Sequence, residues 1–234
     1  MTDTAVLAHT RAAFAAAGQT LANVRRDFPE WHRGRPHYAL WALDVDLADV
    51  RSAVAAASHH LADLLLDGYT RQPHITLGLC GFPTDPPQHP DDFGPRAFTT
   101  QLDALTTLAP APFEIAIGQL ASFSSAPFLA VTDPQNAIGQ LHQALAGPPR
   151  DDASGPYTPH VTVGLYAGVW PTSAVQARLD AFPVPTLRCR VDRVSLMHYV
   201  AAEIGGPLSV LADFDLARRQ LAWHRRPAAW PDFT

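Results

Sequence analysis

The chain has 234 residues, of which 47% are hydrophobic, and its formal net charge is −5. This length allows a sizeable core, buried in one large domain or in two smaller lobes. The acidic balance argues against non-specific binding of long duplex DNA, no apolar run is long enough for a membrane span, and two cysteines are too few for a disulfide framework.

The N-terminal region predicts a helix followed by a short linker. Apolar residues recur at roughly helical spacing over residues 4–28, with Pro29 directly after them. No basic stretch precedes an apolar block, so the sequence predicts no secretory signal and a cytoplasmic protein. In the linker EWHRGRP, the side chains of Trp31, Arg33 and Arg35 either cap a ligand pocket or, through the Trp, anchor the helix to the body. The second interpretation is favoured.

The rest of the chain repeats one order of elements: strand, helix, strand, helix, strand. The first half, about 36–123, predicts strands over 38–45, 73–79 and 112–121 and helices over 47–67 and 96–109. The second half, about 127–200, predicts strands over 127–133, 159–165 and 187–199 and helices over 135–146 and 172–182. This repetition indicates an internal duplication. A last strand over 208–216 completes a domain of residues 36–216, between the N-terminal segment 1–35 and the tail 217–234.

One motif occurs once in each half. Residues 73–79 read PHITLGL and residues 159–165 read PHVTVGL. Alternate side chains of a strand share a face, so His74 and Thr76 point one way, and His160 and Thr162 do the same in the second copy. The intervening aliphatic residues, Leu79 included, are expected in the core. Two lobes, one built from each half of the duplication, would bring the polar faces together across a central cleft if they face each other.

Residues around the motif also repeat. A Tyr-Thr pair stands before each copy, at 69–70 and 157–158. Gly78 and Gly164 share the parity of the His and Thr residues, and each either leaves room for a ligand or eases packing of the sheet. The sequence leaves these two roles equally open.

Two histidines on opposite sides of one phosphorus atom suit in-line displacement. Near neutral pH one imidazole can accept the proton of the attacking oxygen while the other donates a proton to the leaving oxygen. The two Thr hydroxyls can stabilise the charge that develops on the non-bridging oxygens. This chemistry needs neither a metal nor a cofactor.

The paired His-x-Thr strands resemble those of the 2H phosphoesterases, which include bacterial 2′-5′ RNA ligase-like proteins and cyclic nucleotide phosphodiesterases. The resemblance covers roughly residues 36–216. It implies an α+β fold with two antiparallel sheets flanked by helices, related by a pseudo-twofold axis, and an active site in the cleft between them. It also implies a phosphodiesterase that acts on RNA-derived 2′,3′-cyclic phosphates or 2′-5′ linkages, with His74 and His160 as catalytic residues and Thr76 and Thr162 as substrate-binding residues.

Two functions remain as alternatives. The same four residues would serve an RNA 2′-5′ ligase that works in the reverse direction. A non-catalytic module that binds RNA ends or nucleotides is a third hypothesis, although pure binding would not require two imidazoles. The expected partners are RNA ends or small cyclic or oligonucleotide substrates, and the internal duplication predicts a monomer.

Further candidates surround the motifs. Arg71 either contacts phosphate or is solvated, and Tyr166 either stacks a base or packs in the core. One of His198 and Tyr199 is a candidate for lining the cleft, whereas His142 is expected to be exposed on a helix. Specificity is expected from loops 82–95 and 147–156, the linker and the tail.

Overall fold

Two sheets and six helices make up the part of the chain that the computed structural model describes, residues 3–108, 110–146, 156–183 and 185–230. The six-stranded sheet has the order β10-β9-β8-β1-β2-β3 and the four-stranded sheet the order β6-β5-β4-β7. Neighbouring strands are antiparallel, except for β2 and β3, which are parallel. The fold is thus α+β with two antiparallel-rich sheets, as predicted.

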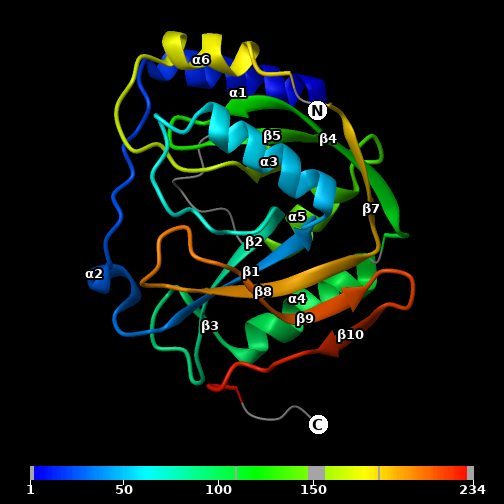
Figure 1. Cartoon of the computed structure of the whole chain (residues 1–234). Helices are drawn as coiled ribbons and strands as arrows, with labels where there is room; N and C mark the ends of the chain where they lie inside the picture. Colours follow the sequence, from blue (N-terminus) through cyan, green and yellow to red (C-terminus); the bar gives the residue numbers. More distant parts are fainter. Residues whose placement is uncertain (1–2, 109, 147–155, 184, 231–234) are drawn as a thin grey trace.

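The helices and strands come in the predicted order, with α2, β3 and β10 in addition. The strands are β1 (His37–Asp44), β2 (His74–Pro83), β3 (Asp92–Phe93), β4 (Phe113–Ser122), β5 (Pro127–Thr132), β6 (His160–Thr162), β7 (Leu187–Val191), β8 (Arg193–Val200), β9 (Ser209–Asp215) and β10 (Gln220–Trp223). The helices are α1 (Asp3–Ala17), α2 (Pro29–His32), α3 (Ala48–His60), α4 (Pro95–Leu108), α5 (Ala137–Leu145) and α6 (Thr172–Asp180). Figure 1 shows α1 and α6 together at one end of the molecule, with β10 near the other end. None of the described helices is long and apolar enough to cross a membrane.

Each sheet takes strands from both halves of the predicted duplication. β4 belongs to the first half but pairs with β5 and β7, and β8 belongs to the second half but pairs with β1. The single strand expected over 187–199 is two strands, β7 and β8, which lie in different sheets. The expectation that each half forms its own lobe is therefore wrong, because the chain crosses between the sheets at Asp192. The outer limits 1–35, 36–216 and 217–234 stay a prediction, although β10 shows that the tail adds a strand to the larger sheet.

The N-terminal helix is shorter than predicted. It ends at Ala17, and Gly18 adopts a φ of +70°, a left-handed conformation that favours glycine and stops helices. The chain then runs extended, and the amides of Thr20 and Asn23 donate to the carbonyl oxygens of Trp170 and Tyr166. The predicted continuation to residue 28 is wrong because these long-range hydrogen bonds replace those of a helix.

The apolar faces of the two motif strands lie in one hydrophobic cluster. Ile75 and Leu77 of β2 are fully buried there, together with Val161 of β6 and Val163 just after it. Leu79 is an exception, since 46% of it is exposed. Irregularities in the register of β1 and β2 place Leu79 opposite Leu40, which belongs to a different cluster on the other face of the sheet. The expected alternation therefore fails beyond Leu77 because β2 is bulged.

Candidate active site

The two motif histidines have the same backbone setting. His74 begins β2 and His160 begins β6. Nδ1 of His74 lies 2.8 Å from the carbonyl oxygen of Gln72, and Nδ1 of His160 lies 2.7 Å from that of Thr158. A carbonyl oxygen can only accept a hydrogen bond, so each Nδ1 carries the proton that it donates. In the neutral form, each ring therefore keeps Nε2 as the acceptor, which can face a substrate.

Burial keeps both imidazoles neutral near pH 7. The pKa of His74 is lowered to about 4, chiefly by burial and also by the charges of Arg71 and His160, while the hydrogen bond to Gln72 opposes this shift. Burial also lowers the pKa of His160, against the hydrogen bond to Thr158. The charge of His160 contributes to the lowered pKa of His74, and β2 contacts β6, so the two histidines lie near each other. Because like charges repel, protonation of one ring disfavours protonation of the other, whereas a bound anion would raise the pKa values of both rings.

A tyrosine from each copy of the repeat reaches the other copy. The hydroxyl of Tyr157, which precedes the second motif, donates to the backbone oxygen of Thr76 in the first motif (2.8 Å). Tyr69, which precedes the first motif, lies near Thr162 of the second: burial raises the pKa of the Tyr69 phenol, and the Thr162 side chain opposes this shift. The Tyr-Thr pairs noted in the sequence thus mark residues that link the two motif strands, a role that sequence reasoning missed.

His142 supports the same junction. Its Nδ1 lies 2.7 Å from the carbonyl oxygen of Leu77 and donates to it. Its ring stacks on that of Tyr157, with centroids 3.7 Å apart and planes 5° from parallel. The expectation that His142 is exposed is wrong, because α5 packs against β2 and directs this residue to the edge of the strand.

Arg71 lies near His74 of the first motif. Its Nε donates to the carbonyl oxygen of Gly206 (3.1 Å), and its guanidinium lies 4.1 Å from the centre of the Tyr199 ring. Its charge contributes to the lowered pKa of His74 and opposes the raised pKa of Tyr199. Within the described residues Arg71 forms no ion pair with a carboxylate, so this charge is available to an anionic ligand.

Two predicted features of the site have a packing role instead. Tyr166 is fully buried and its hydroxyl lies 2.7 Å from Oγ of Ser122, so it cannot stack a substrate base in this conformation. A Cβ on Gly78 would lie 2.7 Å from the carbonyl oxygen of Leu145, and one on Gly164 would lie 2.9 Å from the Leu65 side chain. Both glycines therefore allow close packing rather than ligand clearance.

The N-terminal helix covers part of the face that carries the second motif. Leu7 packs against a cluster that includes Phe128 and Ala130. These two residues lie opposite Thr162 and His160 in the pairing of β5 with β6, and directly opposed residues share a face of the sheet. Helix α1 is thus part of the surroundings of His160, although the resemblance did not include it.

The remaining candidates divide between the two faces of the larger sheet. Tyr199 lies under Arg71, whereas the ring of His198 packs against His37, with centroids 4.4 Å apart.

Loop 147–156 falls outside the described residues except for Pro156. Among the described residues, no group of three or more His, Cys, Asp or Glu side chains is arranged to hold a metal ion.

The chain resembles known proteins in its sequence pattern and in its fold. A family model described as the 2′-5′ RNA ligase superfamily matches residues 47–203. A search of curated proteins gives no significant sequence match.

Among solved structures, TT0787 of Thermus thermophilus is 17% identical, with a TM-score of 0.51, and the match covers 77% of this chain and 98% of that one. E. coli LigT in its apo form is 14% identical, with a TM-score of 0.49, and the match covers 82% and 96%. These likenesses concern the fold alone.

Proposed function

Because the chain belongs to the 2′-5′ RNA ligase superfamily, we propose that it is a phosphodiesterase that opens RNA-derived 2′,3′-cyclic phosphates or cleaves 2′-5′ linkages. The observation that carries this proposal is the matched pair of imidazoles. Each has its Nδ1 proton held by a carbonyl oxygen, and the charge of His160 acts on His74. A protein that only binds nucleotides would need neither two histidines nor the same tautomer in both rings.

The reaction needs one neutral and one protonated imidazole. Nε2 of the neutral ring accepts a proton from water as the water oxygen attacks phosphorus. Nε2–H of the protonated ring donates its proton to the ribose oxygen that leaves, so the pair returns to one proton in total. The hydroxyls of Thr76 and Thr162, together with Arg71, stabilise the negative charge on the non-bridging oxygens. Which histidine is the base depends on the direction from which the substrate binds.

Burial supports this division of roles. In the free protein the pKa values of both histidines are lowered, which leaves both rings unprotonated at pH 7 and so able to accept a proton. A substrate phosphate adds negative charge beside both rings and so raises their pKa values, which favours uptake of the single proton that the acid must donate. The scheme uses only groups of this chain, and we expect it to work without a metal and in a monomer.

The test is turnover of a nucleoside 2′,3′-cyclic phosphate and of a 2′-5′-linked dinucleotide, with a chelator present. We expect His74→Ala and His160→Ala each to lower kcat by at least about 100-fold, the low end for loss of a general acid or base. His59→Gln, which alters an exposed histidine on α3, is the control. Loss of wild-type activity on chelation would contradict the metal-free scheme. Joining of 5′-hydroxyl ends without hydrolysis would favour a ligase, and tight binding without turnover would favour a binding module.

A further inference from the structure

A row of aromatic side chains extends along the face of the six-stranded sheet that carries Thr76. Thr76 lies opposite Ala42, and Tyr38, four residues earlier in β1, lies opposite Tyr199 of β8. Opposed residues share a face, and residues two or four apart in a regular strand do so as well. Tyr38 therefore lies on the same face as Thr76, about 13 Å along the strand at ~3.3 Å per residue.

The row continues from the Arg71 guanidinium to the linker. The Arg71 guanidinium lies over the Tyr199 ring, and the centroid of that ring is 5.7 Å from that of Tyr38. The Trp31 centroid in turn is 5.2 Å from Tyr38 and 5.0 Å from Phe82. Tyr38 and Phe82 are buried, whereas Trp31 and Tyr199 are partly exposed. The partly exposed rings of Trp31 and Tyr199 thus lie at the two ends of the row, and buried aromatic rings lie between them.

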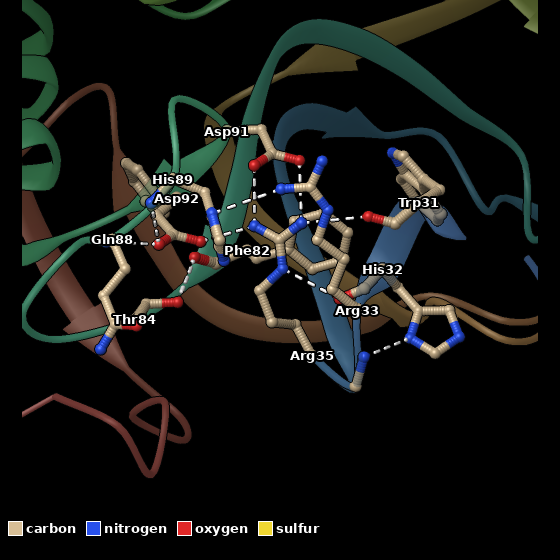
Figure 2. Close-up of polar contacts among 12 residues, drawn as sticks. Trp31, His32, Arg33, Arg35, Phe82, Thr84, Gln88, His89, Asp91 and Asp92 are labelled. Carbon is tan, nitrogen blue, oxygen red and sulfur yellow. Dashed lines mark hydrogen bonds and ion pairs between the residues drawn. The ribbon is translucent and has the colours of Figure 1, made fainter. Parts of the chain in front are cut away.

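Arg35 holds Trp31 in place. Figure 2 shows its guanidinium against Phe82, with hydrogen bonds to both Asp91 and Asp92 and to the carbonyl oxygen of Trp31. The Arg35 guanidinium holds the pKa of the Asp91 carboxyl below its usual range. Arg35 is therefore neutralised and structural, unlike Arg71. Because the linker is fastened in this way, the Trp31 ring is positioned before any ligand binds.

The surface between the catalytic motif and Trp31 suits a nucleobase. Leu79, the exposed aliphatic residue of β2, lies opposite Leu40 on this face. Stacking on exposed aromatic rings, with a guanidinium for the phosphate, is how proteins bind single-stranded nucleic acid with little sequence preference. The net charge of −5 makes such local recognition, rather than long-range attraction, the means of binding.

We propose that Tyr199, Leu79 and Trp31, with Arg71, form a second nucleotide subsite beside the catalytic histidines. The substrate is then an oligonucleotide or RNA strand that carries at least one nucleotide beyond the reacting phosphate, rather than a single nucleotide. This inference rests on the proposed function for the identity of the reacting site. Trp31, and Tyr38 of β1 against which it packs, lie before the region 47–203 that the family model matches.

The test compares a nucleoside 2′,3′-cyclic phosphate with a dinucleotide that ends in the same group. We expect Trp31→Ala to lower kcat/KM for the dinucleotide at least about 5-fold more than for the mononucleotide, the low end for loss of one base–aromatic stack. Trp31→Phe should restore most of the difference. Arg33→Ala, an exposed change in the same segment, should leave both values unchanged. An equal fall for both substrates after Trp31→Ala, or no fall, would overturn the proposal.

A binding measurement separates this proposal from the proposed function. Calorimetry with a nucleoside 3′-phosphate and with a dinucleotide that ends in a 3′-phosphate requires no turnover. We expect the dinucleotide to bind the wild type more tightly and Trp31→Ala to remove the advantage. If neither cyclic substrate turns over but this advantage is present, the phosphodiesterase proposal fails and the subsite stands. Equal affinity of the wild type for the two ligands would overturn the subsite.

Discussion

The buried imidazole of His74 should make the protein less stable in acid. His74 is 7% exposed and its pKa is lowered to about 4 by burial, from 6.5 in an unfolded chain. Because the unfolded state binds the proton more readily, this histidine supports folding above pH 6.5, and that support is lost as the pH falls toward 4. The full effect is roughly 3 kcal/mol, most of which is lost at pH 4.5.

Urea unfolding of the wild type and of His74→Gln at pH 7.5 and pH 4.5 measures how much His74 contributes to the pH dependence of the unfolding free energy. The substitution removes the titrating group, and its other costs are largely the same at both pH values and cancel in the difference. We therefore expect the drop in unfolding free energy between the two pH values to be about 2–3 kcal/mol smaller in His74→Gln. His59→Gln, at an exposed position, should keep the wild-type drop. Equal drops in the wild type and His74→Gln would refute a buried, neutral His74.

Three further predictions concern the site and its packing. The value of kcat/KM should be highest below pH 6.5, because the pKa values of both histidines are lowered in the free protein; an optimum above pH 7 would contradict this. Tyr157→Phe should cost about 1–3 kcal/mol in urea unfolding, because the Thr76 oxygen loses its donor. Tyr199→Phe, which loses a hydroxyl without a hydrogen bond among the described residues, should cost less. Gly78→Ala should destabilise by about 1–3 kcal/mol, whereas Gly118→Ala, where a Cβ meets only ordinary contacts, is the matched control; equal costs would argue against the Gly78 contact.

Much of the candidate site could be predicted from local pattern. The alternation in PHITLGL and PHVTVGL assigned Ile75, Leu77, Val161 and Val163 to the core, and burial confirms all four. Alternation is a property of the strand itself, so it needs no knowledge of the partner strand. The same reasoning failed at Leu79, because a bulge depends on how β2 pairs with β1 and leaves no mark in the alternation. For Tyr166 the packed role is the one observed; the alternative of stacking a base required the parity of His160, and β6 ends at Thr162, so parity no longer applies four residues later.

The sequence by itself determined which segments form helices and strands, the repeated order of these elements, and the choice of the four motif residues as candidates. These depend on residues close together in the chain. Only the tertiary structure decided which strands share a sheet, since β4 and β8 each pair outside their own half. It also decided that Tyr69 and Tyr157 each reach the other motif, and that a Trp from the linker lies on the face of the first motif. Contacts between distant residues depend on the packing of whole sheets and helices, which no local pattern records.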